Sequence, residues 1–229
     1  MHSSRFTGQE FEILWSAYGR DRLPYPLQSH TDISDFDDLK RDRERAAESL
    51  LTKYDPMIER ALDTLLHPDA RLESKGFAGQ DSPRIIRFHG AIRGEGGAAL
   101  AQEPGSTDNT GGDVVLTWCG ADNLAEVAVS ALPERGPGTL APLEIPRSRI
   151  ADEDEHFEYR KGALSAVDQL DRVFRRPRSG HGEIAAYSGG AVDARPTTPE
   201  RTFWWMDYPD GRYYVRTGDP IIAEPLDSS

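Results

Sequence analysis

Residues Asp207 to Tyr213 come closest to a catalytic or metal-binding pattern, because Asp207 and Asp210 place two carboxylates three residues apart. Such a pair could ligate a divalent cation or act as general acid and base. The Pro and Gly beside them favour another interpretation. Pro fixes φ and Gly accepts positive φ, as a tight turn between two aromatic-rich strands requires. The pattern therefore predicts a hairpin turn and only weakly an active site.

The other reactive residues show no spacing that would assemble a site. Cys119 has no second cysteine for a disulfide and no neighbouring histidine to lower the pKa of its thiol. His156 lies among acidic residues that match no metal motif. Gly94–Gly97 lacks the following helix and the Lys-Ser/Thr pair of a phosphate-binding loop, and no histidine has triad spacing. The sequence thus predicts no enzyme, no cofactor and no metal.

Aromatic residues near the C-terminus indicate binding more strongly than catalysis. Successive residues of a strand face opposite sides of the sheet, and here both sides are aromatic. One side can pack in the core, so the other must be covered by something else. That cover is either the protein's own helix or a partner, because exposed aromatic patches often mark interaction sites. The residues concerned are Phe203, Trp204, Trp205, Tyr208, Tyr213 and Tyr214.

The elements that must position these residues begin with helices and continue as an antiparallel meander. Apolar spacing predicts helices over Gln9–Tyr18, Ile33–Leu51 and Pro56–Leu66. We expect the last two to pack as an antiparallel pair, and the prolines of Leu23–Leu27 to give a connector or edge strand. Alternation predicts strands at Arg84–Ile92, Ala98–Gln102 and Asp113–Cys119, and a covering helix over Ala121–Leu132.

The same order recurs after a proline-rich crossover at Pro133–Pro146. It predicts a helix over Ala163–Phe174 and strands at Glu183–Tyr187, Arg201–Tyr208 and Arg212–Arg216. We therefore expect one α+β domain over residues 1–229, in which two related halves, about 1–140 and 141–229, contribute strands to one antiparallel sheet.

The charge and composition of the chain exclude some classes of binding partner. The formal net charge is −12, so the surface repels nucleic-acid phosphates and anionic lipids. No apolar stretch approaches the length of a membrane span, and a single cysteine fits a reducing compartment. The sequence therefore predicts a cytoplasmic protein that binds neither nucleic acid nor membrane.

Four segments, taken in order, resemble one known family. They are Phe6-Thr-Gly-Gln-Glu10 with Leu14-Trp15 and Leu23-Pro-Tyr-Pro-Leu27, then Leu132-Pro-Glu-Arg-Gly-Pro-Gly138, then Gly182-Glu-Ile-Ala-Ala186, and last Asp207-Tyr-Pro-Asp-Gly-Arg-Tyr213. Their order and spacing resemble the EspG family, the cytosolic chaperones associated with ESX (type VII) secretion in actinobacteria. The likeness spans almost the whole chain, whereas the residues after Arg216 lack the helix with which the family usually continues.

The resemblance implies a central antiparallel sheet with helical bundles, arranged as two pseudo-symmetric halves. It also implies binding without catalysis: such proteins grip the helical tip of the PPE protein in a PE–PPE heterodimer, which keeps the substrate soluble and guides its secretion. Carried onto this sequence, the candidate partner-binding residues lie in the second-half strands and the adjoining helix. They are Leu170, Phe174, Trp204, Met206, Tyr213 and Val215.

Two other functions stay open on the sequence alone. One is a small-ligand binding module unrelated to secretion, which predicts a pocket between sheet and helices. The other is a hydrolase or transferase whose carboxylates meet only in space, which predicts a deep pocket with convergent polar groups. The particular client and the oligomeric state, including a weak homo-oligomer, stay open as well.

Overall fold

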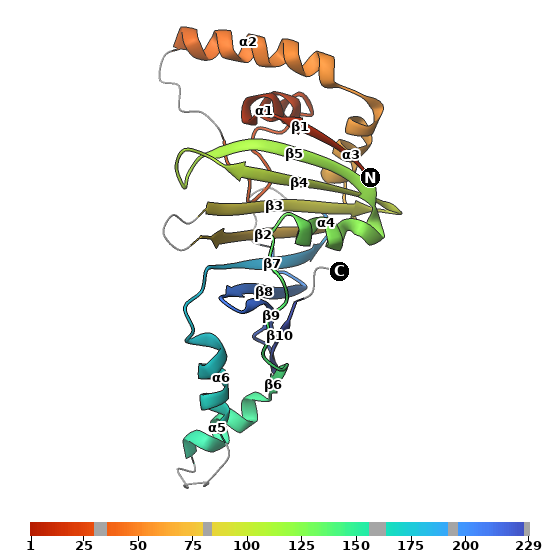
Figure 1. Cartoon of the computed structure of the whole chain (residues 1–229). Helices are drawn as coiled ribbons and strands as arrows, with labels where there is room; N and C mark the ends of the chain where they lie inside the picture. The colour runs from red at the N-terminus through yellow and green to blue at the C-terminus, as the bar shows by residue number, and fades with distance from the viewer. Residues whose placement is uncertain (30–35, 80–83, 156–163, 192–196, 227–229) are drawn as a thin grey trace.

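The computed structural model describes residues 1–29, 36–79, 84–155, 164–191 and 197–226. Within them, ten strands form one antiparallel sheet in the order β1-β5-β4-β3-β2-β7-β8-β9-β10-β6 (Figure 1). The strands are β1 His2–Phe6, β2 Ala70–Ala78, β3 Arg84–Arg93, β4 Gly96–Pro104, β5 Gly111–Gly120, β6 Leu143–Ile145, β7 Gly180–Ser188, β8 Arg201–Tyr208, β9 Gly211–Arg216 and β10 Ile221–Pro225.

The strand order repeats about the central β2–β7 pair. From β2 the sheet runs outward through β3, β4 and β5 to β1, and from β7 it runs outward through β8, β9 and β10 to β6. In each half the strand that comes first in the chain lies at the outer edge and pairs with the strand that comes last. The expected α+β fold with two pseudo-symmetric halves in one antiparallel sheet is confirmed.

Helices follow the first strand of each half. They are α1 Gly8–Ala17, α2 Phe36–Lys53 and α3 Pro56–Leu66 in the first half, α4 Leu124–Ser130 after β5, and α5 Arg147–Glu155 and α6 Ala166–Phe174 in the second half. Both α1 and α6 begin with a capping box, in which Thr7 bonds the amide of Glu10 and Ser165 that of Asp168. The Thr-Gly-Gln-Glu motif is thus a helix start.

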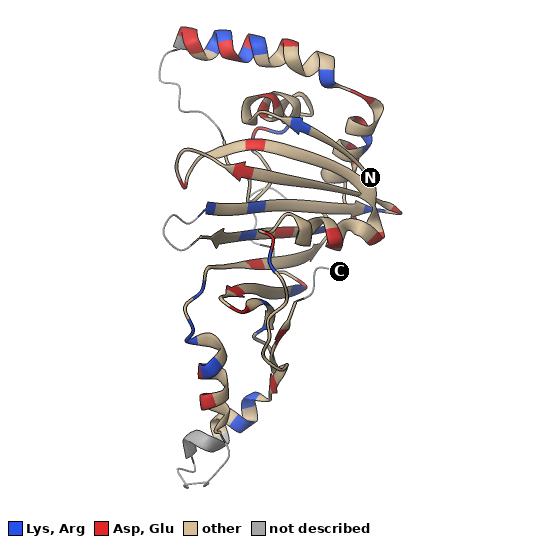
Figure 2. Ribbon diagram, in the orientation of Figure 1, with Lys and Arg blue, Asp and Glu red and all other residues tan. Residues whose placement is uncertain are grey.

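The expected packing of α2 against α3 is wrong. Instead α2 packs on α1, whereas α3 packs on β3, β4 and β5. The physical reason is that the apolar face of α3, which includes Ile58 and Leu62, is buried against the sheet. The helix α2 buries few side chains, and Figure 2 shows acidic and basic residues along its exposed length. It forms an outer layer over α1.

The two sheet faces are covered differently. The first face carries α1 and α3 on one half and α6 on the other, and the helix α4 covers the second face. Figure 1 shows α1, α2 and α3 gathered at one end of the column of strands and α5 and α6 at the other. The centre of the first face, formed by β2 and β7, therefore lies between two helical layers.

Candidate functional site

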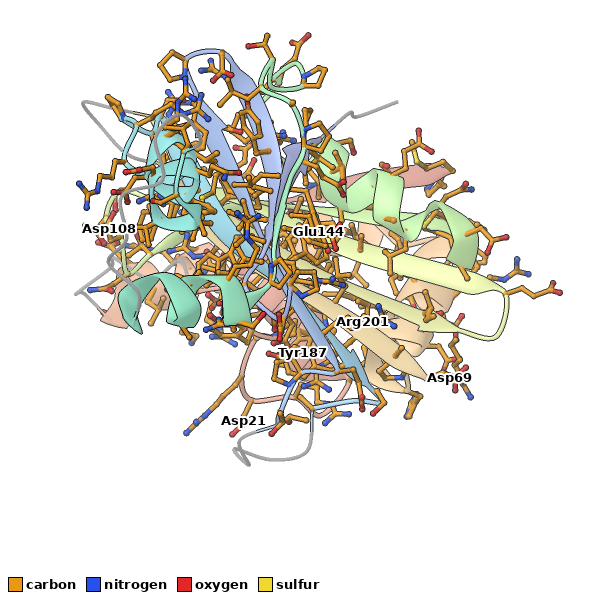
Figure 3. All side chains as sticks on the ribbon, turned by 90° about the horizontal axis from the view of Figure 1, so that it is seen from below. Asp21, Asp69, Asp108, Glu144, Tyr187 and Arg201 are labelled. Carbon is orange, nitrogen blue, oxygen red and sulfur yellow. The ribbon has the colours of Figure 1, made fainter. Side chains whose placement is uncertain are left out.

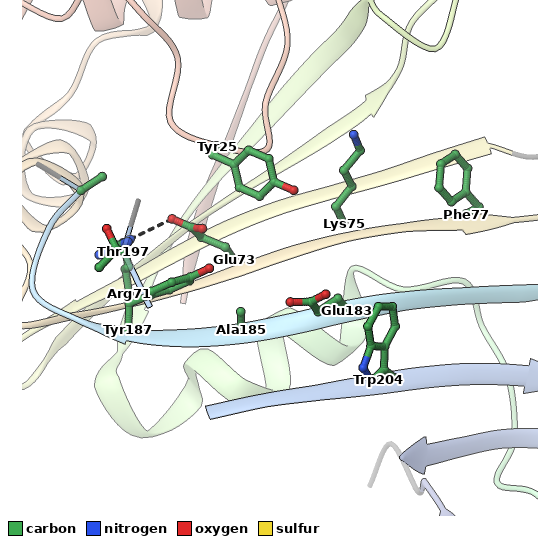
Figure 4. A pocket seen from close by; sticks show the side chains of 11 residues that line it. Tyr25, Arg71, Glu73, Lys75, Phe77, Glu183, Ala185, Tyr187, Thr197 and Trp204 are labelled. Carbon is green, nitrogen blue, oxygen red and sulfur yellow. Dashed lines mark hydrogen bonds and ion pairs between the residues drawn. The ribbon is translucent and has the colours of Figure 1, made fainter. Parts of the chain in front are cut away.

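A hollow of about 600 Å³ lies on the first face between the two helical layers. Figure 4 shows side chains from β2, β7 and β8 projecting into it, with Tyr25 reaching over from the loop after α1. Its lining mixes aromatic and charged groups: Tyr25, Arg71, Glu73, Lys75, Phe77, Glu183, Ala185, Tyr187, Ala191, Thr197 and Trp204. We call this space the central hollow.

The floor of the central hollow is charged but internally balanced. Arg71 donates from Nε to Glu73 Oε1 at 2.8 Å and from Nη1 to the carbonyl of Gly189 at 3.0 Å. Its guanidinium also lies over the Tyr187 ring, 4.1 Å from the centroid. Lys75 occupies the position directly paired with Glu183 across the β2–β7 junction. Opposite charges therefore alternate along the floor and leave no excess of one sign.

The loop that carries Tyr25 is held to the sheet by hydrogen bonds with two buried side chains, His89 and Gln102. His89 Nδ1 donates to the carbonyl of Tyr25 at 2.8 Å, and the Gln102 side chain bonds both the amide and the carbonyl of Gln28. Burial lowers the pKa of His89, so its imidazole is neutral near pH 7. The Tyr25 ring is exposed on the solvent side of this loop. It forms one wall of the central hollow.

An incompletely covered apolar stripe on α6 continues from the hollow. Val167, Leu170 and Phe174 share one side of the helix at helical spacing, and Phe174 and Trp204 pack against the same core cluster. Val167 is 38% exposed, and Leu164, just before the helix, is 46% exposed. Aromatic and aliphatic surface thus extends from Trp204 in the hollow along α6.

The six residues predicted to bind a partner divide into two groups. Trp204 lines the central hollow, and Leu170 and Phe174 are half-buried on α6. Met206, Tyr213 and Val215 lie beneath α6 in the core and are 8% exposed or less. Sequence reasoning missed Tyr25, Phe77 and Val167, because nothing in their local pattern separates an exposed apolar residue from a buried one.

The Asp207–Tyr213 segment is the hairpin turn that its composition predicts. Its two carboxylates point to different partners: Asp207 forms a buried ion pair with Arg212, with Nε–Oδ1 2.7 Å and Nη2–Oδ2 2.9 Å. Asp210 accepts from Tyr213 and Arg176, and from the amide of Thr139. Burial works to raise the pKa of Asp210, but these bonds and the Arg176 charge lower it to about 2.

The other reactive residues do not converge. Burial raises the pKa of the Cys119 thiol, which opposes nucleophilic reactivity. Gly94 lies in the turn between β3 and β4 with φ +54. His156 lies outside the described residues. Across the part of the chain that the structure describes, no three His, Cys, Asp or Glu side chains are grouped to hold a metal ion.

These features define a two-half α+β protein whose ten-stranded sheet leaves an open central face between helical layers. The chain belongs to the EspG family, whose model matches residues 7–229. A search of curated protein sequences found no match. Among the described residues, no helix has the length and apolar character needed to cross a membrane.

One solved structure with a similar fold is the Mycobacterium tuberculosis type VII secretion system chaperone EspG5 in complex with the PE25–PPE41 dimer. The TM-score is 0.56 at 12% sequence identity, and the match covers 100% of this chain and 91% of that chain. At this identity the similarity establishes the shared fold.

Proposed function

We propose that this protein is a cytoplasmic chaperone of a type VII secretion system, formed by residues 1–229 as one domain. It binds a PE–PPE heterodimer through the helical tip of the PPE protein, prevents its aggregation and guides its secretion, without catalysis. Membership of the EspG family supports this role, as does the similarity to a chaperone whose structure contains a PE–PPE dimer.

The observation that carries the proposal is the open stretch of the first face. A helical tip needs an apolar groove with polar groups around it. The central hollow supplies aromatic walls from Tyr25, Phe77 and Trp204, and the balanced pair Lys75 and Glu183 supplies polar contacts. The stripe on α6 extends the apolar surface beyond the hollow. We assign the client to this combined surface.

The candidate residues then take two roles. Trp204, Leu170 and Phe174 are accessible and contact the client directly. Met206, Tyr213 and Val215 are buried beneath α6, and there they hold the helix in the position that presents its stripe.

The test is co-expression with a PE–PPE pair from the same genome, followed by size exclusion with light scattering. We expect a stable complex with the wild type and binding weakened about tenfold or more by Val167→Asp or Trp204→Ala, as for central interface residues. Leu51→Asp is the matched control, because Leu51 is 80% exposed on α2, at the end of the sheet away from α6. Circular dichroism verifies that each variant is folded.

Equal binding by all three variants would place the client elsewhere on the protein. Failure of the wild type to bind any PE–PPE pair of the genome would contradict the chaperone role itself. In that case the volume of the central hollow, about 600 Å³, favours the small-ligand module, because ligand pockets typically span roughly 300–1,000 Å³. Saturable thermal stabilisation by a small molecule, lost in Trp204→Ala, would then identify that function.

A further inference from the structure

A second hollow, of about 690 Å³, lies where β3 begins beside the loop between β4 and β5. We call it the loop hollow, and it shares no residue with the central hollow. Figure 3 shows Asp108 of this loop at the side of the molecule, well apart from Tyr187 of the central hollow. It is lined by Arg84, Ile85, Arg87, Glu103, Pro104, Gly105, Ser106, Thr107 and Asp108.

Arg87 is the unusual residue of the loop hollow. Its side chain is almost completely buried, with 1% of the residue exposed. Nη2 donates to the carbonyl of Asp108 at 2.7 Å. In the described part of the chain, neither Nε nor Nη1 has a hydrogen-bond partner. Burying a cationic donor without partners costs free energy, so such a group calls for a ligand that completes its bonds.

Two other buried arginines show what a fully structural role looks like. Arg212 is also 1% exposed, and it pairs with both carboxylate oxygens of Asp207 and with the carbonyl of Pro133. Arg71 pairs with Glu73 and with a backbone carbonyl. Arg87 has no carboxylate hydrogen-bonded to it among the described residues. Arg87 therefore differs from Arg71 and Arg212 in lacking a carboxylate partner, and not in how deeply it is buried.

None of the acidic side chains that line the loop hollow forms a hydrogen bond with Arg87 among the described residues. Glu103 forms an ion pair with Arg5 at 2.6 Å, and Arg5 also binds Asp113 at 3.2 Å. The negative charge of Asp108 favours the charged form of Arg87 through space. The hydrogen bond between the two residues, however, is accepted by the main-chain carbonyl of Asp108 and not by its carboxylate. Arg84 adds a second, exposed cation at the rim.

We propose that the loop hollow binds a small oxyanion, a phosphate or carboxylate group carried by a small molecule, with Arg87 as its central contact. Oxyanions are the natural partners of a guanidinium, because each oxygen accepts charge-assisted hydrogen bonds from its N–H groups. Nε and Nη1 of Arg87 have almost no exposed surface, so the side chain shifts toward the hollow when the ligand accepts from them. The negative charge of the ligand offsets the desolvated cation, and Arg84 contributes long-range attraction.

The experiment uses the full chain and two probes, inorganic phosphate and acetate, each titrated against chloride at constant ionic strength. We expect at least one probe to raise the melting temperature saturably in the wild type. Hydrogen–deuterium exchange in the same samples should slow at residues 84–88 and 104–110. Saturation by phosphate alone identifies a phosphate-type ligand, and saturation by acetate identifies a carboxylate-type ligand.

Arg87→Gln should weaken this response at least tenfold, whereas Arg93→Gln, at the exposed far end of the same strand, should leave it unchanged. If Arg87→Gln fails to fold, hydrogen–deuterium exchange of the wild type still tests the proposal, because it shows whether the probe protects residues 84–88 and 104–110. The absence of saturable stabilisation by both probes, or protection outside the two segments, would overturn the proposal. An unchanged response in folded Arg87→Gln would overturn it equally.

Discussion

Gly76 and Gly182 face each other as directly paired residues across the β2–β7 junction, and the indole of Trp205 lies against both. A Cβ atom at Gly76 would lie 2.5 Å from Trp205 Cζ2, and one at Gly182 would lie 2.6 Å from Trp205 Nε1. Contacts below 3.0 Å are essentially never found for real Cβ atoms. The two halves can therefore meet here only because both residues lack a side chain.

Gly182→Ala should lower the free energy of unfolding by about 1–3 kcal/mol, the usual range for overpacking a filled core. The new methyl group displaces the Trp205 ring, which is fully buried, so near-ultraviolet circular dichroism should change as well. Chemical denaturation measures the loss. Gly136→Ala is the control, because a Cβ there meets nothing within 4 Å. Equal stability of both variants would show that the ring has room to move.

Arg212→Gln should lower the free energy of unfolding by about 3–5 kcal/mol, because it leaves the Asp207 carboxylate buried without its counter-charge. The same change also removes the bond from Arg212 to the carbonyl of Pro133, which ties the crossover to the hairpin. Thermal and urea unfolding measure the effect. Arg175→Gln breaks an exposed pair with Asp171 and should cost less than about 1 kcal/mol. A small loss in Arg212→Gln would contradict the importance of this pair.

Stability should fall as the pH drops below about 6.5, in part because of His89. Burial lowers the pKa of His89 in the folded protein below its ordinary value of 6.5. Below pH 6.5 the unfolded chain therefore binds a proton that the folded chain excludes, and stability decreases by up to about 1.4 kcal/mol per pH unit for this group. His89→Gln should flatten the dependence between pH 6.5 and 5.

The measurement is urea unfolding at several pH values. Glu73 and Arg71 are the charged groups that act on His89, with opposite effects on its pKa. Burial also lowers the pKa of His181, so His181→Gln serves as the control for a second contribution of the same sign. A pH profile unchanged by His89→Gln would show that His89 accepts a proton in the folded state.

Helices and inner strands were predictable where burial and spacing agree. Pro56–Leu66 has a proline in its first turn and a regular apolar face, and the structure gives this helix the predicted bounds. The strand β2 escaped prediction because Ser74 and Gly76 interrupt the apolar series that Leu72 begins. Its other face carries Arg71, Glu73 and Lys75, which line the central hollow. Short outer strands such as His2–Phe6 and Leu143–Ile145 contain too few residues to show a period.

The sequence pointed to β8, β9 and α6, and Trp204 of this set lines the central hollow, but the sequence did not separate accessible residues from buried ones. The aromatic alternation of β8 and β9 correctly indicated that both faces need covers: the second face receives Leu132 over Trp205, and α6 covers Met206 and Tyr213. Which side chains stay accessible depends on where α6 lies. Its position follows from tertiary contacts such as Arg176 with Asp210 and the Tyr208 ring, and no local pattern encodes them.

The placement of β1 and β6 at the outer edges of the sheet affects how the chain folds during translation. His2 pairs with Trp118, and Ile145 pairs with Ile221. The first strand of each half can therefore pair only after the last strand of that half has been synthesised. Closing such loops costs entropy before the strand pairing offsets it, and pairing between residues far apart in the chain slows folding. While the ribosome is still producing β5, the β1 segment and its apolar Phe6 have no sheet to join. Each half therefore becomes complete in a single late event, when its final strand emerges.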